Sequence, residues 1–252
     1  MFQIVQKKRL NDSMTQMRVA APFVARKAQA GQFIILRVNE YGERIPLTIA
    51  DYDREGGTVD IIFQKVGKTT LLLDTLEEGD AILDFIGPLG KASELEGYQY
   101  AAVIGGGAGC AIAYPQAKAL HALGAKVDMI AGFRSQDIII LGDEVEAASD
   151  NLYLMTDDGS NGHKGFVTDA LRQNIEAGAK YDLVVAIGPL PMMKAVCNLT
   201  KEYGIKTIIS MNSIMIDGTG MCGGCRVSVG GETKFACVDG PHFGGHLVDF
   251  DG

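Results

Sequence analysis

The stretch Tyr100-Ala-Ala-Val-Ile-Gly105-Gly-Gly-Ala-Gly109-Cys110-Ala111 decides the fold of the central part of this chain. Residues 100–104 form an unbroken apolar run, which is typical of a parallel strand buried on both faces. Glycines follow at once, and a helical pattern begins near residue 112, so we expect a strand, a tight turn and a helix in succession. Small residues at such a turn let backbone N–H groups approach a phosphate at the helix N-terminus.

This turn has two interpretations. It departs from the G-x-G-x-x-G pattern because Cys110 occupies the third glycine position, and a glycine turn can also serve only for tight packing of strand on helix. The alternating context favours nucleotide binding. The candidate residues are Gly105, Gly106, Gly107, Ala108, Gly109 and Cys110.

Working outward, apolar runs alternate with helical patterns up to residue 211. We expect further strands at 126–131, 152–156, 183–187 and 207–211, and helices at 112–123, 143–148, 166–176 and 192–203. This alternation predicts a doubly wound parallel sheet with helices on both faces. After residue 211 we expect the chain to leave the sheet.

Two more loops follow predicted strands of this sheet. Asp157, Asp158 and Gly159 come after one, and Gly188 and Pro189 after the next. Both could be ordinary loops, but carboxyl ends of parallel strands meet at one edge, where ligands bind. The two carboxylates would repel a 2′-phosphate, which favours NAD(H) over NADP(H).

The residues before 98 have a different pattern. Short segments rich in Val, Ile, Phe and Thr, separated by turn residues, predict a small antiparallel β-barrel with a helical turn at 69–76. The expected strands are 2–10, 14–21, 32–38, 45–50, 58–66 and 81–86. We therefore expect a barrel domain at 1–97, an α/β nucleotide-binding domain at 98–211 and a C-terminal segment at 212–252.

The barrel carries a candidate anion site. Arg44-Ile-Pro46-Leu47-Thr48 lies on a predicted strand, and Val66-Gly67-Lys68-Thr69-Thr70 stands where a helical turn begins. Arginine and hydroxyls near a helix N-terminus suit a pyrophosphate. From chemistry alone, an ordinary edge strand followed by a capped helix is the preferred interpretation.

The C-terminal segment contains the spacing D-x4-C-x2-C-x11-C, formed by Asp217, Cys222, Cys225 and Cys237. A plant-type 2Fe–2S site reads C-x4-C-x2-C…C, so an aspartate replaces the first cysteine. A structural zinc site is the alternative, although zinc usually takes four Cys or His ligands, often in paired dyads. His242 or His246 could replace Asp217 as a ligand, but solvent-facing or supporting roles are more usual for such histidines.

The composition limits the partners. The chain has 252 residues, of which 47% are hydrophobic and 21% charged, and its net charge is −8. This charge argues against nucleic acid or an anionic membrane surface as a partner, and no apolar run approaches the ~20 residues of a membrane span. Five cysteines, three of them in one motif, fit metal ligation in a reducing cytoplasm. We interpret Cys110 and Cys197 as packing residues.

With these motifs in place, the whole chain resembles the FAD, NAD(P)H and 2Fe–2S electron-transfer subunits built on the ferredoxin–NADP reductase plan. It is more similar to the small subunits of NADH-dependent ferredoxin:NADP oxidoreductase and sulfide dehydrogenase than to that of dihydroorotate dehydrogenase, because these carry the aspartate variant. The resemblance implies an oxidoreductase subunit with FAD, NAD(H) and a 2Fe–2S cluster ligated by Asp217, Cys222, Cys225 and Cys237. It implies hydride exchange between nicotinamide and flavin, with no side-chain acid or base, and then single-electron transfer through the cluster.

The resemblance also assigns flavin residues and a partner. Thr48 is expected near the flavin ring and Arg44 near its phosphates, with Ile62, Phe63 and Gln64, then Gly67, Lys68, Thr69 and Thr70, as the second flavin segment. The implied partner is a larger subunit with another flavin and 4Fe–4S clusters, reached by ferredoxin, and the resembling pair performs electron bifurcation.

The chain departs from the family pattern in three ways. Simpler flavin reductases have the arginine three residues before Ser or Thr, whereas Arg44 lies four before Thr48. Dihydroorotate dehydrogenase subunits usually have a cysteine where Asp217 stands. Related subunits often continue past the acidic end at 248–252, so we expect a reduced or missing docking segment here. A dihydroorotate dehydrogenase subunit, a free-standing flavin reductase with a zinc site, and a module that lost its cofactors are the alternatives.

Overall fold

The computed structural model describes residues 1–251, which form two compact units. The first unit contains Met1–Ser93, Asn212–Val227 and Lys234–Pro241. The second contains Glu94–Met211, Ser228–Thr233 and the residues from His242 onward. The C-terminal part of the chain therefore contributes to both units, and each unit is described by itself below.

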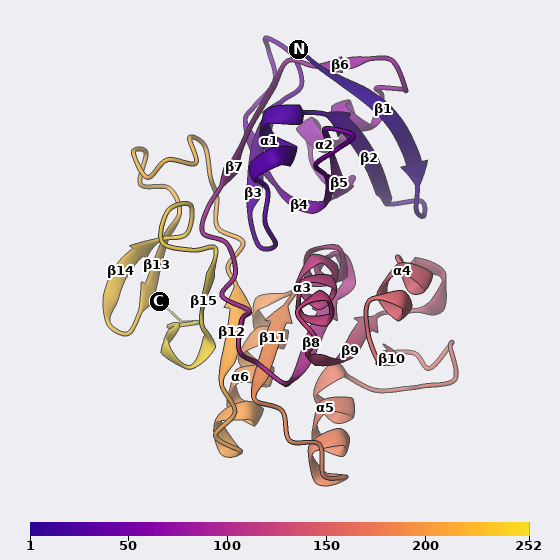
Figure 1. Ribbon diagram of the computed structural model, residues 1–252, viewed down its shortest axis with the longest axis vertical. Helices are drawn as coiled ribbons and strands as arrows, with labels where there is room; N and C mark the ends of the chain where they lie inside the picture. Colours follow the sequence, from indigo (N-terminus) through magenta and orange to yellow (C-terminus); the bar gives the residue numbers. More distant parts are fainter. Residues whose placement is uncertain (252) are drawn as a thin grey trace. The chain divides into compact units, whose positions relative to one another are not determined.

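The first unit is built on a seven-stranded antiparallel sheet that curls into a nearly closed barrel (Figure 1). The strands follow the order β6-β1-β2-β5-β4-β3-β7. Their bounds are β1 (Phe2–Arg9), β2 (Met14–Ala20), β3 (Phe33–Arg37), β4 (Ile45–Asp53), β5 (Thr58–Gln64), β6 (Ala81–Ile82) and β7 (Asp84–Leu89). The predicted barrel is confirmed, and its buried core includes Ile4, Met17, Ile34, Leu36, Ile61, Leu73 and Ile82.

Two elements of the barrel differ from the expectation. The segment expected as one strand at 81–86 is two strands, β6 and β7, which pair with opposite ends of the sheet. A short helix, α1 (Pro22–Lys27), was not predicted. Its signal was Pro22 at the first helical position, where a missing N–H costs nothing.

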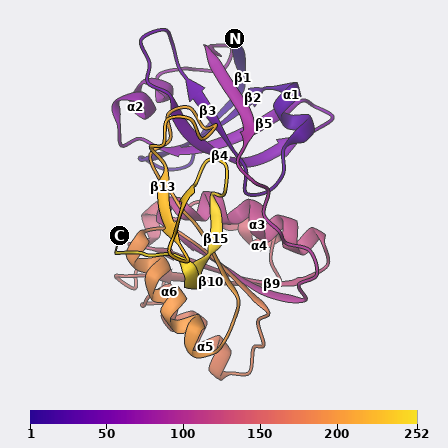
Figure 2. The ribbon, with the colours of Figure 1, turned by 90° about the vertical axis from the view of Figure 1, so that its left-hand side faces the viewer.

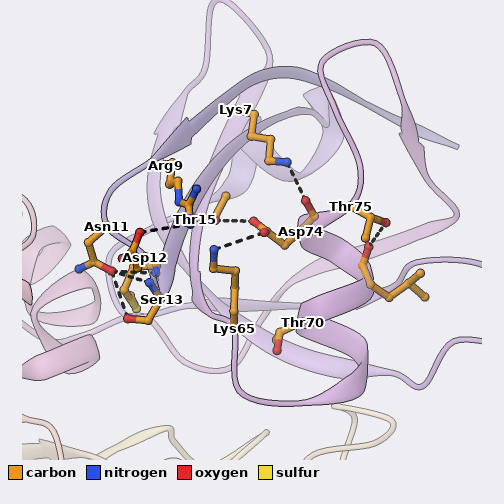
Figure 3. A network of polar contacts seen from close by, with 12 residues as sticks. Lys7, Arg9, Asn11, Asp12, Ser13, Thr15, Lys65, Thr70, Asp74 and Thr75 are labelled. Carbon is orange, nitrogen blue, oxygen red and sulfur yellow. Dashed lines mark hydrogen bonds and ion pairs between the residues drawn. The ribbon is translucent and has the colours of Figure 1, made fainter.

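A polar network anchors the second barrel helix, α2 (Lys68–Asp74), at its C-terminal end (Figure 3). The Asp74 carboxylate accepts a hydrogen bond from Thr15 Oγ1 at 2.5 Å and faces Lys65 Nζ at 3.4 Å. Lys7 Nζ donates to the Asp74 carbonyl oxygen at 2.7 Å. Burial acts to raise the pKa of Asp74, but the bonds from Thr15 and Lys65 outweigh it and lower this pKa. The network ties α2 to β1, β2 and the end of β5.

The second unit holds a six-stranded sheet of order β10-β9-β8-β11-β12-β15. The strands are β8 (Tyr100–Gly106), β9 (Lys126–Phe133), β10 (Asn151–Thr156), β11 (Leu183–Ile187), β12 (Thr207–Ser210) and β15 (His242–Gly244). The first five are parallel, which confirms the doubly wound prediction. The chain leaves this sheet after residue 211, as expected, but it returns at β15, which pairs antiparallel with β12 and was not predicted.

Helices cover both faces of this sheet. Helix α3 packs beside α4 on one face and α5 beside α6 on the other, as Figure 2 shows. Their bounds are α3 (Cys110–Ala122), α4 (Gly142–Ala147), α5 (Val167–Glu176) and α6 (Leu190–Glu202). The shorter elements are a ribbon of β13 (Arg226–Val229) and β14 (Glu232–Phe235), and the 3₁₀ turns η1 (Gly107–Gly109), η2 (Gln136–Ile138) and η3 (Gly245–Leu247). None of the helices within residues 1–251 is long and apolar enough to cross a membrane.

A buried carboxylate fastens the amino-terminal edge of the sheet. Asp128, only 1% exposed, accepts hydrogen bonds from Tyr100 Oη at 2.7 Å, Tyr181 Oη at 2.6 Å and Asn151 Nδ2 at 2.7 Å. Burial and the bond to Asp128 raise the pKa of Tyr181. These donors come from the start of β8, from a residue just before β11 and from the start of β10, so the network ties the strands together at this edge.

Candidate cofactor sites

The glycine turn lies where the strand order reverses. In the order β10-β9-β8-β11-β12, β8 and β11 are adjacent, and the chain passes to opposite sides after them, which is where doubly wound sheets bind ligands. The carboxyl ends of both strands are level, since Ile187 pairs with Gly105. The structure thus brings the first glycine turn and Gly188–Pro189 together, as the sequence predicts for a nucleotide edge.

Most glycines of this turn are required by packing between the two loops. A Cβ on Gly109 would lie 2.4 Å from the Ile187 carbonyl oxygen, and one on Gly106 would lie 2.5 Å from Met192 Sδ. A Cβ on Gly188 would come within 3.2 Å of the Gly106 backbone. The packing interpretation therefore holds for these three positions.

Gly107 and Ala108 differ from their neighbours. Gly107 has a φ of +54°, and a Cβ there would meet nothing within 4 Å. Ala108 is exposed. These two residues form the open part of the turn, so a pyrophosphate approaching the backbone would meet them first.

Cys110 is a packing residue of the turn rather than a reactive thiol. Its side chain is 1% exposed, and its Sγ would lie 2.7 Å from a Cβ on Gly105. Burial raises the pKa of this thiol to about 12. Cys197, on α6, is likewise buried, and its thiol pKa is raised to about 11. Both cysteines therefore remain protonated at neutral pH.

Asp157, Asp158 and Gly159 lie on the same sheet edge, two strands from β8. Asp157 N donates to the Phe133 carbonyl and Asp158 N to the Arg134 carbonyl, at 3.0 and 3.3 Å. The Asp158 carboxylate accepts from Ser160 Oγ at 2.7 Å, and this bond lowers the pKa of Asp158. The carboxylate next to the predicted ribose edge is therefore held in place and charged.

Sequence reasoning missed the loop between these two sites. Arg134 and Ser135 follow β9, the strand between β8 and β10, and Arg134 is exposed. In doubly wound sheets an acidic residue in this region binds the ribose 2′-hydroxyl of NAD, whereas an arginine accommodates the 2′-phosphate of NADP. The sequence contains a signal for this residue, because Arg134 follows the predicted strand at 126–131, whose carboxyl end lies at the ligand-binding edge.

The predicted flavin residues of the barrel lie on two different faces of their strands, the core face and the opposite face. Ile45, Leu47 and Ile49 belong to or pack on the barrel core, so Pro46 and Thr48 point to the other face of β4. On neighbouring β5 the core takes Ile61 and Phe63, which leaves Ile62 and Gln64 on the other face. The side chains of Leu47 and Phe63 are therefore core residues, and four predicted residues share an accessible face.

The second flavin segment forms the start of α2. Thr70 Oγ1 accepts the Gly67 N–H at 3.0 Å and the Val66 N–H at 3.2 Å, which caps the helix. Thr69 is buried, whereas Gly67 and Lys68 are exposed. The Thr70 hydroxyl already serves the cap, so Gly67 and Lys68 are the groups of this turn open to a ligand.

Arg44 precedes β4, and its guanidinium turns toward the C-terminal cysteine loop. Its Nη2 donates to the Asp217 carbonyl oxygen at 3.4 Å. Its Nε is buried and has no hydrogen-bond partner within residues 1–251. The resemblance assigned this side chain to flavin phosphates, whereas the structure places it beside the proposed cluster loop.

The four proposed cluster ligands stand as two pairs. Cys225 Sγ and Cys237 Sγ are 3.2 Å apart, and Cys222 Sγ lies 3.5 Å from Asp217 Oδ1. No three His, Cys, Asp or Glu side chains within residues 1–251 surround a single metal position. A 2Fe–2S cluster takes two protein ligands on each iron, so a carboxylate–thiol pair and a thiol–thiol pair on one loop fit this group.

The Asp217 carboxylate is organised by its own loop. It accepts the Met221 and Cys222 N–H groups at 3.0 Å each and the Thr219 N–H at 3.1 Å. The bond from Thr219 and those from Cys222 lower the pKa of Asp217 to about 2. Asp217 is therefore ionised at neutral pH, as a metal ligand must be.

The two nearby histidines have other partners. His242 Nε2 lies 3.4 Å from Gln116 Nε2, and His246 Nε2 lies 3.0 Å from Thr200 Oγ1. Burial lowers the pKa of His242 to about 4 and also lowers that of His246. The alternative in which a histidine replaces Asp217 gains no support from these contacts.

Two family models match parts of this chain. Residues 212–249 match the iron–sulfur cluster binding domain of dihydroorotate dehydrogenase B, and residues 103–198 match the oxidoreductase NAD-binding domain. The chain is 51% identical to an uncharacterized Clostridium beijerinckii protein from the adh 3′ region, over all of this chain and 88% of the relative. It is 46% identical to a Thermotoga maritima homolog of the dihydroorotate dehydrogenase B electron transfer subunit, over 99% of this chain and 88% of the relative.

Solved structures point the same way. A chain of NADH-dependent reduced ferredoxin-NADP oxidoreductase, studied for flavin-based electron bifurcation, has a TM-score of 0.94 and 45% identity, covering 99% of this chain and 90% of that one. The cytochrome b5 reductase domain of Ulva prolifera nitrate reductase shares the fold, with a TM-score of 0.64 and 18% identity, over 81% of this chain and 92% of that one. These matches confirm the predicted fold and support FAD, a 2Fe–2S cluster and NAD(H) as cofactors. The chain belongs to the family of oxidoreductase electron-transfer subunits that includes those of dihydroorotate dehydrogenase B, with an NAD-binding domain and an iron–sulfur cluster domain.

Proposed function

We propose that this electron-transfer subunit serves an enzyme of the ferredoxin:NADP oxidoreductase type, in which a larger flavin and 4Fe–4S subunit is its partner. The observation that carries the proposal is the aspartate in the cluster loop, paired with Cys222, in a chain 45% identical over nearly its whole length to a subunit of such an enzyme. When bound, the cofactors supply hydride and single-electron transfer, and the protein supplies position and electrostatics.

The chain's own residues divide this task among three places. Gly107 and Ala108, beside Gly188 and Pro189, would hold the nucleotide pyrophosphate at the sheet edge. The outward face of the barrel, with Pro46, Thr48, Ile62 and Gln64, and the exposed turn at Gly67–Lys68 would hold FAD. Asp217 and Cys222 would ligate one iron, and Cys225 and Cys237 the other.

The cluster loop also offers a surface for the partner. Cys222 is exposed, and the large apolar side chains around it are exposed as well, namely Ile214 (76%), Ile216 (54%), Met221 (88%) and Val238 (38%). A Cβ on Gly220 would touch Val238, and one on Gly224 would lie 3.5 Å from the Ile214 carbonyl, so these residues border one loop. Clustered exposed apolar residues are typical of a protein interface. We place the docking face of the larger subunit here.

Substitution of Asp217 tests the ligand assignment. Asp217→Cys should retain a 2Fe–2S cluster with a changed visible spectrum and potential, whereas Asp217→Ala should lose the cluster or make it labile. Asp249→Ala, an exposed aspartate outside the loop, is the control and should match the wild type. A full and spectroscopically unchanged cluster in Asp217→Ala would show that Asp217 is not a ligand.

The runner-up is the electron-transfer subunit of an NAD-dependent dihydroorotate dehydrogenase, which the names of several relatives at 30–34% identity favour. Co-purification of a tagged chain from its native cell distinguishes the two. A partner with 4Fe–4S clusters that reduces NADP+ supports our proposal, and a partner that oxidises dihydroorotate supports the runner-up.

We also keep the cytoplasm as the proposed location, because all five cysteines are free.

A further inference from the structure

We propose that Arg44 is a positioning residue of the cluster loop, and that its charge raises the redox potential of the cluster that this loop would hold. This inference rests on the proposed cluster site. It departs from the role that family resemblance gives to this side chain, which is contact with the flavin phosphates.

Arg44 occupies a different position from the arginine of simpler flavin reductases, because it lies just before β4. An arginine three residues before the hydroxyl residue would alternate to the opposite strand face, because side chains in a strand have a period of two. Arg44 lies four residues before Thr48 and one residue before β4 begins at Ile45, so strand alternation does not set the direction of its side chain. Its guanidinium reaches the Asp217 carbonyl oxygen from there.

The cluster loop packs directly on the barrel at this place. Gly218, with a φ of +75°, sits so close to the barrel that a Cβ would lie 2.8 Å from Leu89 Cδ1 and 3.0 Å from Ile35 Cγ1. Ile35 is paired with Pro46 across β3 and β4, two residues from Arg44. Independent contacts therefore place the Asp217–Gly218 peptide beside the start of β4, and the hydrogen bond from Arg44 is one of them.

The charge of Arg44 lacks an anionic partner within the described chain. Among residues 1–251 its one polar contact is the neutral carbonyl of Asp217, and its Nε–H is buried without any acceptor. A partly buried cation without an anion is costly, because desolvation is not offset. A negatively charged group bound at the loop would supply the missing acceptor or counter-charge, and a cluster with three thiolates and a carboxylate is such a group.

The electrostatic consequence has a definite sign. Reduction adds one electron to the cluster, and a nearby positive charge favours the more negative state. Removing the charge of Arg44 should therefore make the cluster harder to reduce, which is a more negative midpoint potential. Hydrogen bonds and charges around a cluster are general determinants of its potential.

The experiment compares wild type with Arg44→Gln, Arg44→Lys and a matched control, Arg54→Gln. Arg54 also donates to a backbone carbonyl, that of Ala28 at 2.8 Å, but lies at the other end of β4, roughly 30 Å away at ~3.3 Å per residue. Each protein is prepared anaerobically, its flavin, iron and sulfide contents are measured, and the cluster is titrated with dithionite while its EPR signal is followed.

We expect a more negative midpoint potential in Arg44→Gln, and values near wild type in Arg44→Lys and Arg54→Gln. An unchanged potential in Arg44→Gln overturns the inference, as does a loss of FAD as the only effect, which would return Arg44 to the flavin phosphates. Absence of iron and sulfide from the wild type would instead refute the cluster site itself.

A second measurement covers a variant that holds too little cluster to titrate. In the apoprotein, hydrogen exchange of the Thr219, Met221 and Cys222 amides, which donate to Asp217, should be faster in Arg44→Gln than in Arg54→Gln. Equal exchange in the two variants would show that Arg44 does not position the loop.

Discussion

Gly109→Ala tests whether the nucleotide turn is shaped by packing between two strand ends. Gly109 has helical backbone angles, φ −61° and ψ −21°, so alanine meets no conformational strain there. Any loss of stability must come from contacts of the added methyl group. Its three nearest atoms are all backbone: the Ile187 carbonyl oxygen at 2.4 Å, Gly188 Cα at 2.8 Å and the Ile187 carbonyl carbon at 2.9 Å.

The size of the effect follows from these distances. Ordinary van der Waals contact begins at 3.4 Å, so the methyl group is 3.4 − 2.4 = 1.0 Å too close to the carbonyl oxygen. No flexible side chain can move aside, and both loops continue from buried strands. Overpacking of this kind costs about 1–3 kcal/mol. If the turn shifts to relieve this overlap and nucleotide binding loses the same ~1–3 kcal/mol, the affinity for NADH weakens by about 5- to 150-fold.

Urea unfolding of the apoprotein and titration with NADH measure the two effects. Gly107→Ala is the companion variant, with a left-handed φ and open space, and should lose NADH affinity with a smaller loss of stability. Gly124→Ala, also with a positive φ and nothing within 4 Å, gives the cost of alanine in that conformation alone, about 1 kcal/mol. If Gly109→Ala is as stable as wild type, the described contact between the two loops is wrong.

Three further predictions address the rest of the molecule. His242 has a folded pKa of about 4 and an unfolded value near 6.5, so the unfolded state binds more protons between these two pH values. The free energy of unfolding should therefore fall by up to ~1.4 kcal/mol per pH unit on acidification from pH 6.5 to 4. His242→Val should flatten this slope in urea unfolding. In the apoprotein, mass spectrometry after alkylation should find Cys222 modified and the buried Cys110 unmodified. Cluster assembly should then protect Cys222, whereas rapid labelling of Cys110 in the folded protein would contradict its burial. Arg134→Gln should lower the ratio of kcat/KM for NADPH to kcat/KM for NADH, and Asp158→Asn should raise it, each by about fivefold, which corresponds to ~1 kcal/mol. Unchanged ratios in both variants would place the adenosine ribose elsewhere.

Elements with a strong local pattern were predictable from the sequence. The buried runs that form β8 and β11 and the helices between them follow from apolar periodicity, and the observed bounds lie close to the expected ones. Elements held by distant partners were not predictable. β15 has only three residues and exists because β12 offers it an edge, and the break between β6 and β7 arises because each pairs with a different strand.

The candidate sites divide in the same way. Spacing alone brought Asp217 and the three cysteines together as candidates, because ligand spacing is a local property. The direction of Arg44 depends on contact with a loop 173 residues later, which no local pattern contains. Likewise, the division of the glycine turn into packing positions and open positions depends on β11, which is far away in sequence.

Anaerobic purification tests the electron relay most directly, with analysis of flavin, iron, zinc and acid-labile sulfide followed by addition of NADH while the visible spectrum is recorded. We predict one FAD and two irons with two sulfides per chain, and bleaching of flavin and cluster together by NADH. Zinc without sulfide, or bleaching of flavin in a protein that contains no iron, would contradict the electron relay and leave a simple flavin reductase.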